Sequence, residues 1–195
     1  MLEPRTIAFS RTRLTELMVP SFANFGGKVH GGIILSLMDK VAYACASKHA
    51  GAYCVTVTVD GVEFLQPVEV GELLSLDATV HYVGNTSLVV GIKVTSENVK
   101  SNFVKHTNNS YFTMVAKGDD GNPTKVPELI LSDIKEMRNF VDSIKRMKVK
   151  REANAKMQKE HDDFIPADDM SLLQDQRCKI SFSTDEDFSD LFSDT

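Results

Sequence analysis

The sequence predicts an α+β fold in which one antiparallel sheet wraps around a single long helix. Two observations lead to this prediction. Between residues 33 and 49, apolar side chains recur with the helical period, at Ile34, Leu37, Met38, Val41, Ala42 and Cys45. From residue 54 onward the period becomes two, and β-branched side chains alternate with polar ones.

The elements follow in a simple order along the chain. Thr6–Leu17 is short and β-prone and predicts a first strand, and the glycine-rich segment 20–32 predicts a loop leading into the helix. Lys48, His49 and Gly51 are typical of a helix C-terminus. The alternating runs that follow predict four long strands in meander order, with a turn at Gly84-Asn85-Thr86-Ser87 and a closing turn at 118–123. Such a sheet leaves an edge and a helix face uncovered, and a dimer is the simplest way to cover them.

The charge distribution divides the chain. Of its 195 residues, 42% are hydrophobic and 25% charged, which excludes general disorder, and the net charge of -5 gives no support for nucleic-acid binding. Residues 135–159 hold 9 basic and 3 acidic residues, whereas residues 160–195 hold 2 and 11. We therefore expect a globular domain over 8–125, a basic and helical extension over 126–160, and an acidic, mobile tail over 161–195.

Location is predicted from what the sequence lacks. Cys45, Cys54 and Cys178 cannot all pair within one chain, and their spacing fits no metal site. The sequence contains no apolar stretch of about 20 residues and no signal-peptide core at its beginning. We expect a cytoplasmic protein with reduced cysteines and no membrane partner.

The residues that point to chemistry lie where the loop meets the helix. The N–H groups near Gly31 and Gly32 begin a helix, where they can stabilise an oxyanion. Asn24 offers an amide in the loop, and Asp39 is a carboxylate within an otherwise apolar helical run. Asp39 follows Gly32 by seven residues, which is roughly 10 Å along a helix. If the two act together, they must come from different subunits of a dimer.

Other chemistries find less support. The sequence has no Gly-x-Ser-x-Gly elbow, phosphate-binding loop or dinucleotide fingerprint. His30 is expected to be a turn residue, and His49 and His106 lack metal-ligand spacing. Taken alone, Asp39 is more readily a solvated helix residue, and Asn24 and the glycines are more readily a flexible loop with a helix entry. Cys45 is expected to be a core residue.

These residues resemble a known family. The sequence is similar to the hotdog-fold acyl-CoA thioesterases in five motifs that occur in the same order. These motifs are Asn24-x-x-Gly27-x-x-His30-Gly31-Gly32, Met38-Asp39, Val55–Asp60, Phe64-Leu-x-Pro67-Val-x-Val-Gly71-Glu and Gly84–Ser87. The similarity is greatest to the acyl-CoA hydrolase branch that includes the YciA and brain acyl-CoA hydrolase proteins. It covers roughly residues 8–125, and residues 126–195 match no pattern.

The resemblance implies a hotdog fold and an active site shared between opposing subunits. Asn24 and Asp39 take the positions of the family's catalytic Asn and Asp, with Asp39 as general base or nucleophile, and the Gly31 and Gly32 amides bind the oxyanion. The strand residues Val57, Thr58 and Val59 and the turn residues Gly84, Thr86 and Ser87 take the positions that contact CoA. The family needs no cofactor, since CoA belongs to substrate and product, and it commonly forms trimers of dimers.

Three functions are therefore considered. The first is hydrolysis of acyl-CoA to a fatty acid and CoA by a homodimer. The second is a regulator that binds acyl-CoA without cleaving it and uses its C-terminal segment to engage a partner. The third is a thioester dehydratase or hydratase, for which His30 is the nearby candidate base.

Overall fold

A computed structural model describes residues 2–165 and 169–181 of the chain. The strands are β1 (Arg5–Thr6), β2 (Thr12–Leu17), β3 (Tyr53–Asp60), β4 (Leu73–Val83), β5 (Ser87–Asn98), β6 (Phe103–Lys117) and β7 (Leu129–Ile130). The α-helices are α1 (Ile7–Ser10), α2 (Gly31–Ala50) and α3 (Ile134–Asp162), and two short 3-10 helices span Pro20–Phe22 and Met170–Leu173.

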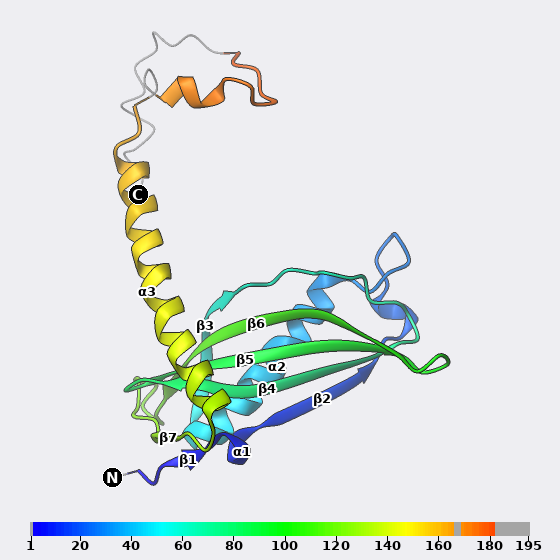
Figure 1. The fold of residues 1–195 in the computed structure, drawn as a ribbon, viewed down its shortest axis with the longest axis vertical. Helices are drawn as coiled ribbons and strands as arrows, with labels where there is room; N and C mark the ends of the chain where they lie inside the picture. The colour runs from blue at the N-terminus through cyan, green and yellow to red at the C-terminus, as the bar shows by residue number, and fades with distance from the viewer. Residues whose placement is uncertain (1, 166–168, 182–195) are drawn as a thin grey trace. The chain divides into compact units, whose positions relative to one another are not determined.

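The main sheet has five antiparallel strands in the order β2-β4-β5-β6-β3 (Figure 1). The predicted meander is correct for β4, β5 and β6 but wrong for β3, which pairs with β6 rather than with β4. The reason is the connection over residues 61–72, which is much longer than a hairpin loop and lets the chain return to the far side of β5 and β6. As a result, β3 is an edge strand.

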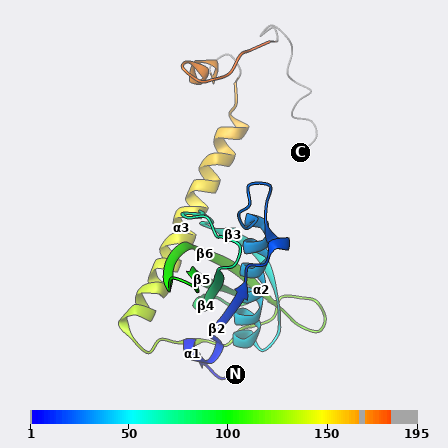
Figure 2. The same ribbon diagram turned by 90° about the vertical axis from the view of Figure 1, so that its right-hand side faces the viewer.

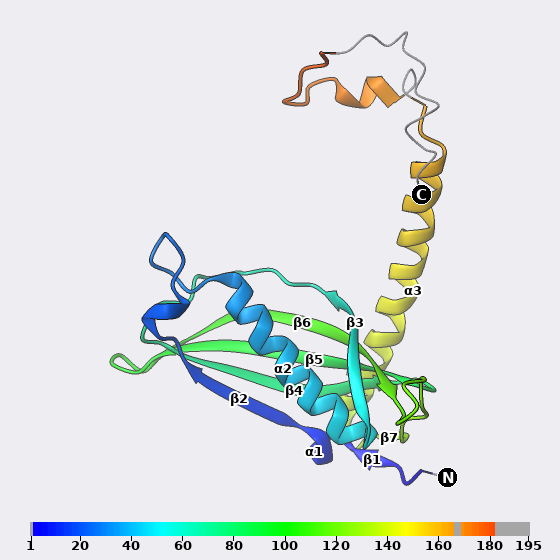
Figure 3. The ribbon, with the colours of Figure 1, turned by 180° about the vertical axis from the view of Figure 1, so that it is seen from behind.

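Helix α2 packs across one face of this sheet and touches all five of its strands (Figure 3). All six residues of the predicted apolar stripe are buried, which confirms the helical period as the signal of the core. The facing strands β4 and β6 bury every second residue, among them Leu74, Leu76, Ala78, Val80, Phe112, Met114 and Ala116. The helix ends at Gly51, whose φ of 69° is the left-handed conformation that favours glycine at this position.

The N-terminal segment differs from the single strand that was predicted over Thr6–Leu17. Residues 7–10 form α1, because the hydroxyl of Thr6 accepts a hydrogen bond from the Phe9 N–H at 3.3 Å and caps a helical turn. Only Thr12–Leu17 joins the main sheet, while Arg5–Thr6 pairs in parallel with β7.

The chain divides into two compact units, Met1–Arg146 and Met147–Thr195. In the first unit, the beginning of α3 lies on the sheet face opposite α2 (Figure 2). The Phe140 ring lies 4.9 Å from that of Tyr82, and the Arg146 guanidinium lies 3.9 Å from the centroid of Tyr111. The second unit contains the rest of α3 and the 3-10 helix Met170–Leu173. Parts of the predicted tail, 166–168 and 182–195, lie outside the described residues.

Candidate active site

Asp39 lies on an exposed side of α2, beneath the edge strand β3. The hydroxyl of Thr56, in the middle of β3, donates a hydrogen bond of 2.6 Å to Asp39 Oδ1. A short bond to an ionised oxygen is among the stronger hydrogen bonds in proteins and fixes the direction of the carboxylate. Asp39 is therefore an oriented acid group rather than a freely rotating surface side chain.

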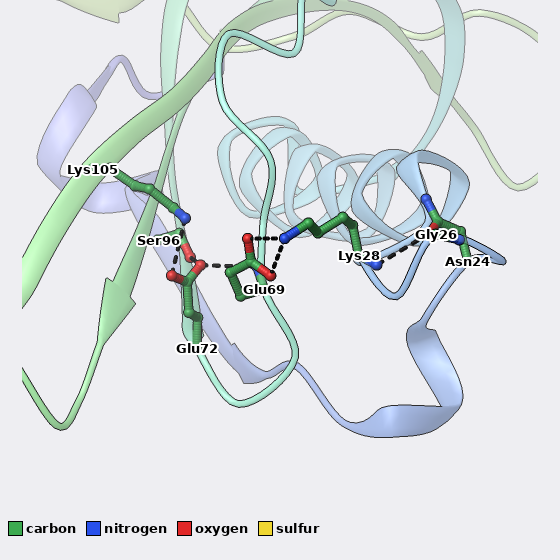
Figure 4. Close-up of polar contacts among 7 residues, drawn as sticks. All are labelled: Asn24, Gly26, Lys28, Glu69, Glu72, Ser96 and Lys105. Atoms are coloured by element: carbon green, nitrogen blue, oxygen red, sulfur yellow. Dashed lines mark hydrogen bonds and ion pairs between the residues drawn. The ribbon is translucent and has the colours of Figure 1, made fainter.

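Asn24 is held in a tight loop before the helix. Its Oδ1 accepts hydrogen bonds from the N–H groups of Gly26 at 2.9 Å and Lys28 at 3.1 Å. Its backbone N–H donates to the carbonyl of Lys28 at 2.6 Å. The side-chain nitrogen points away from the Gly26 and Lys28 amides (Figure 4). The exposed Asn24 side chain thus presents an N–H donor in a fixed direction.

The predicted oxyanion site lies at the start of α2, where His30 occupies one of the N–H groups. Gly31 and Gly32 form the first turn, and His30 caps it by accepting the Gly32 N–H on Nδ1 at 2.9 Å. A Cβ on Gly31 would lie 3.3 Å from the Phe64 ring, so the backbone here is closely approached. His30 uses its Nδ1 lone pair as a cap, so the neutral ring carries its proton on Nε2 and lacks a free lone pair for base catalysis. This disfavours the dehydratase hypothesis.

A groove of about 600 Å³ runs between α2 and the end of β3. Its wall contains the helix residues Gly32, Leu35, Ser36 and Asp39 and the apolar side chains Val59, Val62 and Phe112. A predominantly apolar groove with one oriented carboxylate is typical of a small-molecule site. It brings Gly32 and Asp39 to the same surface, yet two helical turns apart.

The remaining predicted site residues lie in two places. Val57, Thr58 and Val59 lie in β3, beside the groove. Gly84, Thr86 and Ser87 form the β4–β5 turn, where the Gly84 N–H donates to the Ser87 carbonyl at 2.8 Å. Ser87 pairs with Val115 near the end of β6, at the end of the sheet where α2 finishes. A single chain therefore does not bring this turn to the Asn24 loop.

Thr56 is the residue that sequence reasoning missed. It shares an alternating run with Thr58, and nothing in the sequence distinguishes the two hydroxyls. A register shift between Thr56 and Thr58 in the β3–β6 pairing interrupts the regular alternation of the strand. The one available signal was a polar side chain in an edge strand that follows the helix carrying Asp39.

Two buried cysteines lie away from this chemistry. Burial raises the pKa of the Cys45 thiol to about 12 and also raises that of Cys54. Both side chains belong to the core, as expected for Cys45. Among the described residues no three His, Cys, Asp or Glu side chains are grouped to hold a metal ion. In the same part of the chain, every helix is too short or too polar to cross a membrane.

Comparisons with known proteins now decide the family. Residues 26–101 match the thioesterase superfamily. Protein VdlD of Helicobacter pylori is 45% identical over 142 residues, which cover 72% of this chain and 81% of that protein. The chain belongs to the thioesterase superfamily. Its five-stranded sheet around α2 is the hotdog fold of that superfamily, as the sequence predicted.

Solved thioesterase structures resemble the chain closely. An apo-hexameric acyl-CoA thioesterase superimposes with a TM-score of 0.76 and 31% identity, covering 79% of this chain and 99% of that one. The acyl-CoA hydrolase of Staphylococcus aureus, solved with butyryl coenzyme A, coenzyme A and its disulfide, gives a TM-score of 0.73 and 27% identity. The match to the Staphylococcus aureus hydrolase covers 81% of this chain and 96% of that one.

The Staphylococcus hydrolase has also been solved as three alanine variants, of an asparagine, an aspartate and a threonine. In that protein the asparagine precedes the aspartate by 15 residues, and the threonine follows the aspartate by 17. The same spacings separate Asn24, Asp39 and Thr56. The threonine that the structure joins to Asp39 thus has a counterpart by position.

Proposed function

We propose that this chain hydrolyses acyl-CoA thioesters to a free acid and CoA, at a site shared by two hotdog subunits. The observation on which this rests is the placement of Asp39. Thr56 orients the carboxylate toward the open edge of the sheet, and the helix N-terminus of the same chain lies about 10 Å away. A second chain is needed to bring an oxyanion site to Asp39.

A two-fold axis supplies that arrangement. Suppose that two copies of α2 run antiparallel and that the two-fold axis passes near Leu35 and Ser36, halfway between Gly32 and Asp39. Each Asp39 then lies beside the first helical turn of the partner's α2. Leu35 and the β3 residues Val57 and Val59 are exposed apolar side chains around this level, and Phe25 beside Asn24 is fully exposed. A hydrophobic interface between subunits would cover them.

In this dimer the proposed reaction uses few groups. Asp39 removes a proton from a water molecule, and the water oxygen attacks the thioester carbonyl. The Asn24 amide of the partner donates to the water or the carbonyl. The N–H groups at Gly31 and Gly32 of the same partner stabilise the oxyanion, and the Gly32 N–H does so after it has left His30 Nδ1, to which it donates in this structure. The C–S bond then breaks, and the CoA sulfur takes the proton. Direct attack by the Asp39 carboxylate is the alternative role for the same group.

We propose the groove lined by Val59, Val62 and Phe112 as the site of the acyl or pantetheine chain. The two-fold rotation reverses the partner's sheet end for end, which moves the partner's Gly84–Ser87 turn toward the end of the molecule where Asn24 lies. This supports the proposal that Val57–Val59 and Gly84, Thr86 and Ser87 contact CoA. Assembly into a trimer of dimers and a cytoplasmic location, in keeping with three free cysteines, belong to the same proposal.

Release of thiol from a panel of acyl-CoAs from C2 to C18 tests the function. Wild type is expected to release CoA thiol, and Asp39→Ala and Asn24→Ala are expected to lose activity while keeping the oligomer. Full turnover by Asp39→Ala would contradict the proposal, and stoichiometric binding without thiol release would favour the regulator.

The division into domain 8–125, extension 126–160 and tail 161–195 stays a prediction. The first compact unit ends at Arg146, so we propose that a chain ending after Arg146 retains activity. A chain ending after Lys125 lacks β7 and the Phe140 and Arg146 contacts, and comparing the two chains measures what the segment 126–146 contributes.

A further inference from the structure

A series of polar contacts joins the Asn24 loop to strands β5 and β6 (Figure 4). The residues that link Asn24 to these strands have no part in the proposed reaction. The series begins at Glu72, whose side chain is buried. Its carboxylate accepts hydrogen bonds from Ser96 Oγ on β5 at 2.6 Å and from Lys105 Nζ on β6 at 3.0 Å. Burial raises the pKa of Glu72, but the hydrogen bonds from Glu69 N, Ser96 and Lys105 and the charge of Lys105 outweigh it and leave the pKa lowered.

Glu72 in turn fixes the turn that precedes β4. Glu72 Oε2 accepts the Glu69 N–H at 3.0 Å, and the backbone of Met18 bonds to the same turn through the Glu72 carbonyl at 2.9 Å and the Gly71 N–H at 2.7 Å. The position of Glu69 is therefore set by strands β5 and β6 and by Met18, the residue that follows β2. A buried and fully hydrogen-bonded carboxylate is a rigid support.

Glu69 passes this position to the Asn24 loop. Lys28 Nζ lies 2.6 and 2.8 Å from the two Glu69 carboxylate oxygens. The Val29 N–H also donates to the Val68 carbonyl at 2.9 Å. Lys28 then binds Asn24 twice through its backbone, donating its N–H to Asn24 Oδ1 and accepting the Asn24 N–H on its carbonyl.

We propose that Glu72 and the Lys28–Glu69 ion pair are positioning residues that hold the Asn24 amide at the active site, an inference that rests on the proposed thioesterase function. Both side chains of the pair are more than a third exposed, at 47% and 38%, so the pair contributes little to global stability. Its role is to limit the movement of Asn24. Displacement of a catalytic group by about 1 Å is enough to reduce turnover by up to roughly a hundredfold.

The test compares Lys28→Met and Glu69→Gln with a matched control, Arg13→Met. Arg13 forms an exposed ion pair with Asp77 at 2.6 Å, on β2 and β4 and remote from the Asn24 loop. We expect kcat to fall roughly tenfold in the two loop variants with KM changed less than about twofold, and both constants to stay unchanged in Arg13→Met. The reversed pair Lys28→Glu/Glu69→Lys is expected to recover most of the lost kcat.

Amide hydrogen exchange gives a second readout that needs no activity. The Gly26 and Lys28 amides donate to Asn24 Oδ1, so we expect faster exchange in a peptide covering residues 24–30 when the pair is broken, and no change in Arg13→Met. For Glu72 the double variant Glu72→Gln/Lys105→Met is used, because it leaves no unpaired buried charge, and the same increase is expected.

Unchanged exchange in the loop variants would overturn the inference, as would faster exchange with unchanged kcat. A rise in KM at constant kcat would also overturn it, because Lys28 would then act by binding substrate. If wild type releases no thiol, the proposed function fails on that result alone, while the exchange experiment still measures whether the pair holds the loop.

Discussion

If each active site takes Asn24 from one subunit and Asp39 from the other, two inactive variants should restore one another when their subunits mix. In a heterodimer of Asn24→Ala and Asp39→Ala, one site receives both substitutions and the other receives neither. Two antiparallel copies of α2 require this pairing, because Asp39 is about 10 Å from the Gly32 amide of its own chain. Sites formed within one chain would each keep one substitution.

The expected magnitude follows from counting. Equal amounts of the two variants give heterodimers as about half of all dimers when subunits exchange at random, and each heterodimer has one intact site of two. The mixture should therefore reach about one quarter of the wild-type rate per subunit. Exchange among the dimers of a larger assembly leaves this fraction unchanged, since each site involves one dimer.

The assay is thiol release from an acyl-CoA that wild type hydrolyses, measured before mixing, after mixing, and after dilution and reassociation. Subunit exchange is verified by native mass spectrometry of the mixture, with one variant isotopically labelled. Activity that stays at the level of the separate variants, with heterodimers present at about half of the dimers, would refute a site shared between subunits.

Three further outcomes are expected. Thr56→Val removes the hydroxyl that orients Asp39 and should lower kcat by roughly 10-fold or more, while Thr56→Ser should keep most of the wild-type kcat. Equal rates for the two variants would show that the 2.6 Å bond has no catalytic role. Gly91→Ala should lower the free energy of unfolding by about 1–3 kcal/mol in denaturant titration, because its Cβ would overlap the His81 ring; an unchanged midpoint would contradict this. Burial, with smaller effects of Arg146 and Lys135, lowers the pKa of His81 to about 4. The His81 ring therefore takes up a proton near pH 6.5 in the unfolded state but only near pH 4 in the folded state. The free energy of unfolding should fall by about 3 kcal/mol as the pH drops from 6.5 to 4, and His81→Gln should lose that part of the pH dependence.

The helix and the strands could be predicted because their burial follows a strict period. The six apolar residues from Ile34 to Cys45 that recur with the helical period form one stripe of α2, and β4 and β6 bury alternate residues against it. The middle strand β5 is buried on both faces over residues 88–92. The N-terminal segment and the place of β3 could not be predicted in the same way. Thr6 starts a helical turn through one local hydrogen bond, and the pairing of β3 with β6 depends on the path of the 61–72 connection, for which alternation carries no information.

Within the candidate site, the residues that act through backbone position were easier to predict than their supports. Gly31 and Gly32 precede an apolar period, so the N–H groups of a helix start can be recognised from sequence alone. Thr56 is an ordinary strand residue by sequence, and Glu72 an ordinary turn residue. What distinguishes them is a hydrogen bond to a distant residue: Thr56 bonds to Asp39, 17 positions away, and Glu72 to Ser96, 24 positions away. Such long-range hydrogen bonds leave no local pattern.

The two halves of the proposed site are supported by different parts of the fold. A bond to the edge strand β3 orients Asp39, whereas Asn24 is connected through Lys28, Glu69 and Glu72 to β5 and β6. Both supports consist of hydrogen bonds within one chain. Separation of the subunits would move the Asp39 of one chain away from the Asn24 of the other, so the proposed activity depends on assembly.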